Sequence, residues 1–181
     1  MKSRMLSRMA MAAVFVAGTA FASAPGDAGI ARSVRHEVLT YPYYTLWDDI
    51  SFQVDNGNVV LEGAVTEPYK KTDLTKLMQR IPGVASVTND LKVLPLSDFD
   101  NRLRWQVARA IFSDPLLSRY AMGANPSIHI IVDNGHVTLT GAVSTQTDKE
   151  MAGIRANGAG LAFGPIVNNL SVDQPAKGKR S

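Results

Sequence analysis

Cysteine is absent from the 181 residues, which excludes disulfides, thiol catalysis, thiolate metal sites and lipid attachment at an N-terminal cysteine. Catalytic motifs are absent as well. The three histidines, His36, His129 and His136, lie far apart without metal-site spacing, and no serine lies in a Gly-x-Ser-x-Gly motif. We therefore expect no enzymatic activity, no catalytic residue and no cofactor, and we expect each histidine to be an ordinary solvated or strand-surface residue.

Calcium loops are also missing. The segments Asp55–Gly57 and Asp133–Gly135 are similar to the start of such a loop, but neither is followed by the alternating acids and the closing glutamate that calcium requires. Turn formation explains both segments, and we expect no metal site.

A basic surplus is missing from most of the chain. The formal charge is +3, from 19 basic and 16 acidic residues, but Lys2, Arg4 and Arg8 account for all of it. The neutral remainder argues against a nucleic-acid-binding protein. This remainder is slightly acidic before Leu96 and slightly basic after it, so the second half is the better candidate for contact with an anionic surface.

A marked apolar run occurs only near the N-terminus. Met9–Ala22 is uncharged, follows three basic residues and ends in Ala-Phe-Ala, which is typical of a secretory signal peptide. We expect residues 1–22 to be removed after Ala22, because cleavage after Ala24 would leave Pro25 next to the cut. We therefore expect a periplasmic protein without a transmembrane span in its mature chain. A membrane anchor is the weaker alternative, because the run is shorter than the ~20 residues of a span.

What the sequence does contain is an internal repeat. VDNGNVVLEGAV at Val54–Val65 recurs as VDNGHVTLTGAV at Val132–Val143. Each copy predicts a β-hairpin, because its Asn-Gly pair, Asn56-Gly57 or Asn134-Gly135, tolerates the positive φ angles of a type I′ turn.

The Asn-Gly turn also fixes the register of each hairpin. In the first copy Val54 then pairs with Val59, and Phe52 with Leu61, which places the apolar residues on one face. Gly63 and Gly141 fall on this face, where we interpret the missing side chain as room for a helix to approach the sheet.

Helical spacing flanks the first hairpin. Ile30, Val34 and Val38 predict a helix capped near Asp27, and Pro68–Arg80 predicts a second helix. The second helix has a basic stripe that we expect to be solvated, formed by Lys70, Lys71, Lys76 and Arg80. A third strand follows around Val84–Val93.

The second repeat has the same order of elements, with additional residues between Pro115 and Ile128. Its last helix contains Gly153, Gly158 and Gly160, each of which weakens a helix by about 1 kcal/mol, so we expect it to be short or frayed.

The fold class predicted from this order is α+β. Each repeat reads helix, strand, strand, helix, strand, and a three-stranded sheet covered by two helices closes such a core. The expected domains are residues 29–95 and 96–173, after a short leader at 23–28 and before a basic tail at 174–181. The connection Leu94–Ser97 is short, so we expect the two domains to pack together.

The repeated hairpin and its glycine, with the Pro82-Gly83-Val84 turn and the following Val87, Asn89 and Leu91, resemble the BON domain. This family is named for bacterial osmotically inducible periplasmic proteins and nodulation proteins. In the second repeat, Gly158–Pro165 replaces the Pro-Gly-Val turn. The resemblance implies a non-catalytic periplasmic module, commonly in tandem, that binds phospholipid or connects envelope proteins under osmotic stress.

The predicted helix Asp98–Phe112 has two contrasting faces. Leu103, Val107 and Ile111 form a core stripe. The opposite face carries the candidate lipid- or partner-binding residues, Arg102, Trp105, Arg109 and Phe112. Aromatic rings flanked by arginines suit the headgroup layer of a membrane. Burial of the two rings against the first repeat or the Tyr120 loop is an open alternative.

A second aromatic cluster, formed by Tyr41, Tyr43, Tyr44 and Trp47, precedes the first hairpin. It closes the end of the first core or forms a contact surface. The tail residues Lys177, Lys179 and Arg180 add weak attraction to anionic lipid, about 1 kcal/mol each near such a surface.

Two functions follow as hypotheses. The first is binding to anionic phospholipid at the membrane surface, in envelope maintenance or osmotic stress. The alternative is a periplasmic stress chaperone or protein–protein adaptor, which an exposed apolar patch would serve equally. The oligomeric state does not follow from the sequence.

Overall fold

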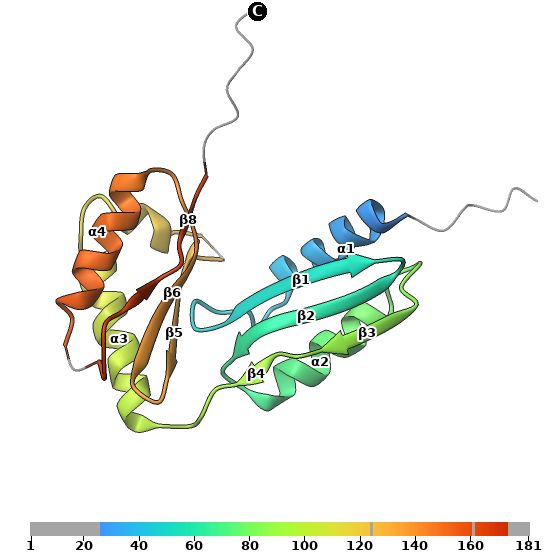
Figure 1. The fold of residues 1–181 in the computed structure, drawn as a ribbon, viewed down its shortest axis with the longest axis horizontal. Coiled ribbons are helices and arrows are strands. Elements are labelled where there is room, and N and C mark those ends of the chain that lie inside the picture. Colours follow the sequence, from blue (N-terminus) through green and yellow to red (C-terminus); the bar gives the residue numbers. More distant parts are fainter. Residues whose placement is uncertain (1–25, 124, 161, 174–181) are drawn as a thin grey trace, which may run out of the picture.

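The chain forms two α+β units in tandem, each a small sheet covered by two helices (Figure 1). The structure, a computed structural model, describes residues 26–123, 125–160 and 162–173. The predicted signal peptide and basic tail lie outside these residues. None of the helices in the described ranges combines the length and the apolar character needed to cross a membrane.

The first unit follows the predicted order, with the third strand divided in two. Its elements are α1 (Asp27–Thr40), β1 (Asp49–Asp55), β2 (Asn58–Val65), α2 (Pro68–Gln79), β3 (Ser86–Asn89) and β4 (Lys92–Val93). β1 is antiparallel to β2, whereas β3 and β4 are both parallel to it. The helices bury Val34 and Leu74 completely in the core between them and the sheet.

The second unit repeats this arrangement with a short 3-10 helix added before the hairpin. Its elements are α3 (Asp98–Phe112), η1 (Ser118–Ala121), β5 (Ile128–Asp133), β6 (His136–Val143), α4 (Gln146–Asn157), β7 (Val167–Asn168) and β8 (Ser171–Val172). The additional residues predicted between Pro115 and Ile128 therefore contain η1. The α+β fold predicted from the sequence is confirmed.

Both hairpins turn as predicted. Asn56 and Gly57 have φ angles of 48° and 78°, and Asn134 and Gly135 have 50° and 79°, as a type I′ turn requires. The register is also confirmed, with Val54 opposite Val59 in the first hairpin and the matching pairs in the second.

The interpretation of Gly63 and Gly141 was wrong. Both have positive φ angles, 119° and 103°. A Cβ atom on Gly63 would lie 2.2 Å from the carbonyl oxygen of Asp49, and one on Gly141 would lie 2.1 Å from that of Ser127. The missing side chain therefore makes room for the neighbouring backbone within the hairpin, and no helix is involved.

An aspartate at the start of the first helix supports the hairpin turn in each unit. Asp27 accepts hydrogen bonds from the backbone N–H groups of Asn56 and Gly57, at 2.8 and 2.9 Å. Asp100 accepts the corresponding bonds from Asn134 and Gly135, at 3.0 and 2.8 Å. The helix predicted to be capped near Asp27 has its N-cap at Gly26, and the Asp27 carboxylate serves the turn instead.

Lys70 does not belong to a solvated stripe, contrary to the prediction. Its side chain is buried, and its Nζ lies 2.7 Å from Asp48 Oδ2 and 2.8 Å from Thr66 Oγ1. Asp48 is fully buried and also accepts bonds from the backbone of Thr45 and Thr66. A buried lysine is tolerated here because its charge is paired and two of its N–H donors have acceptors.

Helix α4 is not shortened by its glycines, which corrects a further expectation. It has 12 residues, as many as α2. Gly158 is its C-cap, so Gly158 and Gly160 lie beyond the helix. Gly153 lies inside it, where a Cβ would come 2.9 Å from the Asn168 side chain, which donates to the Lys149 carbonyl. The glycine thus leaves room for a bond between helix and strand.

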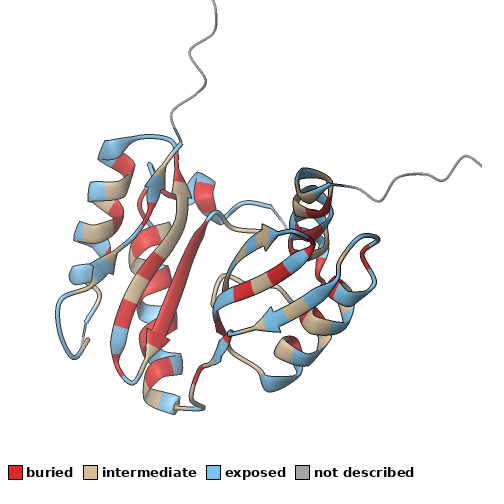
Figure 2. Cartoon of the chain, turned by 45° about the vertical axis from the view of Figure 1, so that its right-hand side comes forward, coloured by how far each residue is buried: buried red, intermediate tan, exposed pale blue. Residues whose placement is uncertain are grey.

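The two units contact each other, as the short connection predicted. Ile131 on the outer face of β5 packs with Ala64 and Leu94 of the first unit. Lys92 and Asp133 form an ion pair across the same contact. The outer face of the second sheet is therefore partly covered by the first unit (Figure 2).

Candidate functional site

Helix α3 turns one side to solvent because its other side fills the second core. Leu103, Val107 and Ile111 are buried there, as the periodicity predicted. Ser97 caps the helix by accepting a bond from the Asp100 backbone N–H at 3.2 Å. The buried stripe and the cap together determine which residues of α3 face the solvent.

Three of the four predicted site residues lie together on this outward side. Arg102, Trp105 and Arg109 are exposed and line a shallow hollow of about 500 Å³. Trp105 keeps 62% of its surface exposed, which is unusual for such a large apolar side chain. Asp98 lies on the same hollow and reduces its positive charge.

Phe112 does not join the other three. It is only partly exposed and packs against the core of the second unit. Phe112 is the last residue of α3, so its ring can fold back over the end of the core. The structure therefore supports the burial alternative for Phe112 and the exposed alternative for Trp105.

Trp105 also contacts the first unit. Its ring meets that of Trp47 edge-on, with centroids 5.1 Å apart and planes at 71°. The alternative in which Trp105 packs against the first repeat is therefore correct in part. The contact covers only part of the indole ring. The exposed part of the ring remains next to both arginines.

Leu96 is a further residue of this surface that the sequence analysis missed. It is 85% exposed and lines a small pocket together with Trp47 and Trp105. One feature of the sequence could have indicated that Leu96 is exposed. It is a lone leucine between Pro95 and Ser97, in a connection too short to fold back over it. Leu96, Trp47 and Trp105 are the large apolar side chains at the junction of the two units, beside the polar Thr66 and Glu67, and we call these three residues the junction surface.

Arg104 lies on the same helix but faces inward. It is buried and donates to the carbonyl of Val132 at 2.8 Å and to Asn101 Oδ1 at 2.5 Å. Burial lowers the pKa of its guanidinium, against the opposing effect of Asp100. Arg104 therefore holds α3 to β5 and adds no charge to the outward side.

The predicted tyrosine cluster divides between two roles. Tyr41 is buried in the first core, and its hydroxyl donates to Asp73 at 3.2 Å. Tyr43 remains exposed against Tyr69. Tyr44 and Trp47 instead reach the second unit, so both interpretations of the cluster hold for part of it.

His129 is not solvated, which corrects the expectation for this histidine. It lies on the outer face of β5, as its alternation predicts, but the first unit covers that face and leaves it 7% exposed. His36 and His136 are exposed as expected. Within the described ranges, no three histidines or carboxylates gather closely enough to hold a metal ion.

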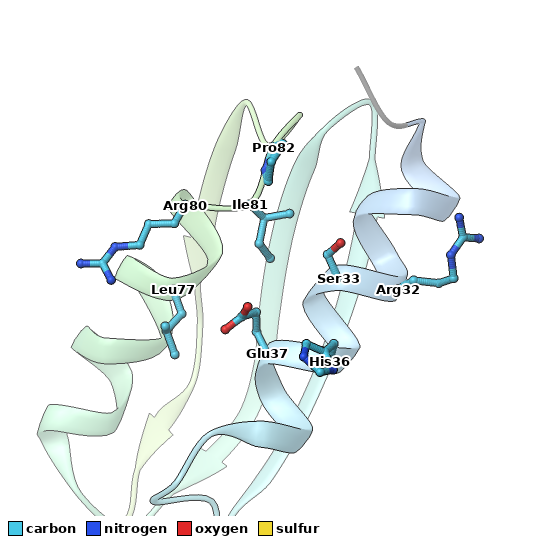
Figure 3. A pocket seen from close by; sticks show the side chains of 8 residues that line it. All are labelled: Arg32, Ser33, His36, Glu37, Leu77, Arg80, Ile81 and Pro82. Atoms are coloured by element: carbon cyan, nitrogen blue, oxygen red, sulfur yellow. The ribbon is translucent and has the colours of Figure 1, made fainter. Parts of the chain in front are cut away.

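A hollow of about 490 Å³ between α1 and α2 also has basic residues at its border (Figure 3). Arg32 and Arg80 border it but point outward in opposite directions, while Glu37 points into the space between the helices. The two cations therefore do not converge on one ligand, and the hollow is a poorer anion site than the α3 side.

Several solved structures are similar to the chain. Two of them are CdsD, a structural protein of the type III secretion system of Chlamydia trachomatis, and the C-terminal domain of the same protein. The identities are 14% and 15%, and the TM-score is 0.31 for both. The matches cover 79% and 78% of this chain but only 60% and 63% of those chains.

No curated protein matches the chain in sequence. The model of the BON domain, in contrast, matches twice, over residues 26–95 and 100–174. These two matches coincide with the two α+β units and with the repeat seen in the sequence. They cover most of the chain, which therefore belongs to the BON domain family as a tandem pair.

Proposed function

We propose that this protein binds the surface of anionic membranes through the outward side of α3 and the junction surface. It would do so as a non-catalytic periplasmic protein of envelope maintenance or the osmotic stress response. The observation that carries the proposal is the exposed Trp105, flanked by Arg102 and Arg109 on one rigid helix. BON domains are in general linked to phospholipid or membrane-surface binding, which supports the same assignment.

The chemistry of this side suits the headgroup layer. An indole ring is stable where one edge is apolar and the other is hydrated, and guanidinium groups bind phosphate through paired N–H donors. Leu96 adds an apolar side chain beside Trp105 on the junction surface. These residues can enter the interface without any change in the fold, because they are already exposed.

The expected affinity is modest and sensitive to salt. Each arginine contributes about 1 kcal/mol near an anionic surface, and salt weakens exposed charges over about 8–10 Å. Asp98 offsets part of this attraction. The protein would therefore associate reversibly and would respond to the headgroup composition of the membrane.

Co-sedimentation with vesicles tests the proposal. The chain from Ser23 should bind phosphatidylglycerol vesicles at low salt and lose binding at high salt, and it should not bind phosphatidylcholine vesicles. Arg109→Glu reverses one charge and should weaken binding roughly 10- to 30-fold, and Trp105→Ala should weaken it similarly.

Matched controls exist in the same chain. Arg32→Glu makes the same charge change on an exposed residue of α1, and Ile154→Ala removes an exposed apolar side chain from α4. Both should bind like the unaltered chain. Equal losses in the control variants, or no binding to either kind of vesicle, would contradict the proposal.

A further inference from the structure

The edge strands of the two sheets occupy equivalent positions but differ in burial. β5 is buried along almost its whole length, whereas no residue of β1 is buried (Figure 2). Each strand pairs with its hairpin partner on one side only. The difference must therefore come from what lies against the other side.

A segment of the first unit covers the free side of β5. The backbone N–H of Ile130 donates to the carbonyl oxygen of Leu46 at 2.8 Å. Leu46 and Trp47 pack against the core of the second unit. The segment thus combines one main-chain bond to the edge strand with two adjacent apolar side chains.

Phe52 is the residue of β1 that corresponds to Ile130, since each lies opposite the leucine of its hairpin. Pairing alternates along an antiparallel ladder, so the N–H of Phe52 points away from β2 as that of Ile130 points away from β6. Among the described residues, no bond between backbone groups joins β1 to anything other than β2, and on this edge the Ile50 N–H faces the Tyr44 hydroxyl. The position filled by Leu46 in the second unit is open in the first.

The open position is a groove of about 370 Å³ between α1 and β1. Apolar side chains form much of its lining, from Val38 and Leu39 on the helix and from Ile50 and Phe52 on the strand, and the lining is completed by the more polar Arg35, Tyr44 and Ser51. Leu39 is 47% exposed, although it lies on this wall. The guanidinium of Arg35 lies 6.0 Å above the centroid of the Phe52 ring, at the rim.

We propose that this groove binds an extended apolar segment of another protein, which adds to the free edge of β1. The segment accepts a main-chain bond from the Phe52 N–H and places two adjacent large apolar side chains between α1 and β1. In the second unit, Ala108 occupies the position that corresponds to Arg35. The arginine therefore adds a preference for an acidic residue beside the apolar pair.

A polypeptide fits these features better than a lipid does. Edge-strand addition uses main-chain groups for affinity and side-chain pockets for specificity, and a lipid chain has no repeating carbonyl groups to offer. The occupied groove of the second unit shows the geometry that such a segment adopts. This surface is separate from the outward side of α3, so the proposal is independent of membrane binding.

The probe that tests it is a labelled peptide with the sequence of residues 43–49, YYTLWDD, which contains the segment that covers β5. Fluorescence anisotropy with the chain from Ser23 should show saturable binding. A peptide with serine in place of Leu46 and Trp47 should bind at least about tenfold more weakly.

Variants assign the binding to the first groove. Leu39→Glu should weaken it by about tenfold or more, and Arg35→Glu should weaken it by a smaller factor. Ile154→Glu is the matched control, because Ile154 is exposed to a similar extent on α4 of the other unit. Hydrogen exchange at the Phe52 amide should slow when the peptide is bound.

Three outcomes would overturn the proposal. The first is the absence of saturable binding. The second is equal binding by Leu39→Glu and the unaltered chain, which would indicate exchange with the segment in the second unit. The third is an unchanged rate of hydrogen exchange at the Phe52 amide when the peptide is bound, which would place the peptide away from the edge of β1.

Discussion

Tyr44 of the first unit stacks on His129 of the second, with ring centroids 5.1 Å apart and planes at 25°. The Tyr44 hydroxyl lies 3.4 Å from Nε2 of the histidine. Burial lowers the pKa of His129, and the carboxylates of Asp49 and Asp48 oppose this effect. The contact between the units therefore contains a histidine whose burial favours its neutral form.

This histidine should make stability depend on pH. Because its pKa is lower in the folded chain, the unfolded chain binds more protons between the two pKa values, so stability falls as pH decreases below about 6.5. Thermal unfolding between pH 5 and pH 8 measures the effect. His129→Gln should flatten the profile, and an unchanged slope in this variant would exclude His129 as the cause.

Asp49 acts in the opposite direction and can be separated from His129. Burial raises the pKa of Asp49, so the folded chain binds the extra proton and stability from this group falls as pH rises through its folded pKa. The pH range in which Asp49 affects stability begins at its ordinary pKa of 3.8 and extends upward to its pKa in the folded chain. Asp49→Asn should therefore increase stability at neutral pH. It should also deepen the loss on acidification, because the Asp49 carboxylate no longer opposes the lowering of the His129 pKa.

The aspartate that supports each hairpin turn gives a second prediction. Asp100→Asn should lower the free energy of unfolding by about 2 kcal/mol, because two N–H groups lose a charged acceptor in a buried site. Asp27→Asn should cost less, because Asp27 is partly exposed. Urea unfolding measures both. Asp98→Asn, an exposed residue of the same helix as Asp100, is the control and should have little effect.

Alanine at the hairpin glycines gives a third prediction. Gly63→Ala and Gly141→Ala should each destabilise the fold by about 3 kcal/mol, because the φ angle is positive and the new Cβ would meet a backbone carbonyl. Gly26→Ala is the control, since a Cβ atom on Gly26 would have no other atom within 4 Å. Similar unfolding midpoints for all three variants would show that the hairpin relaxes around the methyl group.

The buried pair of Lys70 and Asp48 gives a fourth prediction. Lys70→Met should cost roughly 3–5 kcal/mol, because it leaves the buried Asp48 carboxylate without its counter-charge. Adding Asp48→Asn to this variant should restore part of the loss. Chemical unfolding of the two single variants and the double variant gives the coupling energy, and additive losses would contradict a coupled pair.

The hairpins were predictable because a local rule determines them. The Asn-Gly turn fixes the register, and the register then determines which side chains share a face, with no information needed from the rest of the chain. The supporting role of Asp27 and Asp100 was also present in the sequence, since both residues lie in the first turn of the first helix of their repeat. It was missed because an acid at a helix start is ordinarily interpreted as a cap.

Three other errors share one cause. Lys70, His129 and Gly63 were interpreted from their own segment, but each is determined by a partner distant in the chain or across the hairpin. Periodicity places a residue on a face and does not say what covers that face. The same limit applies to the candidate site. Helical spacing correctly predicted that Arg102, Trp105 and Arg109 share an exposed side, but it did not predict that Phe112, at the end of the helix, packs against the core.

The bond from Ile130 to Leu46 gives the pair of repeats a direction. In an isologous contact the two partners would bury the same surface, but here one repeat contributes a loop and the other contributes a strand edge. The contact is heterologous, of the kind that extends head to tail. Exchanging the order of the two repeats would not rebuild it, since only the leading repeat carries Leu46 and Trp47 ahead of its hairpin.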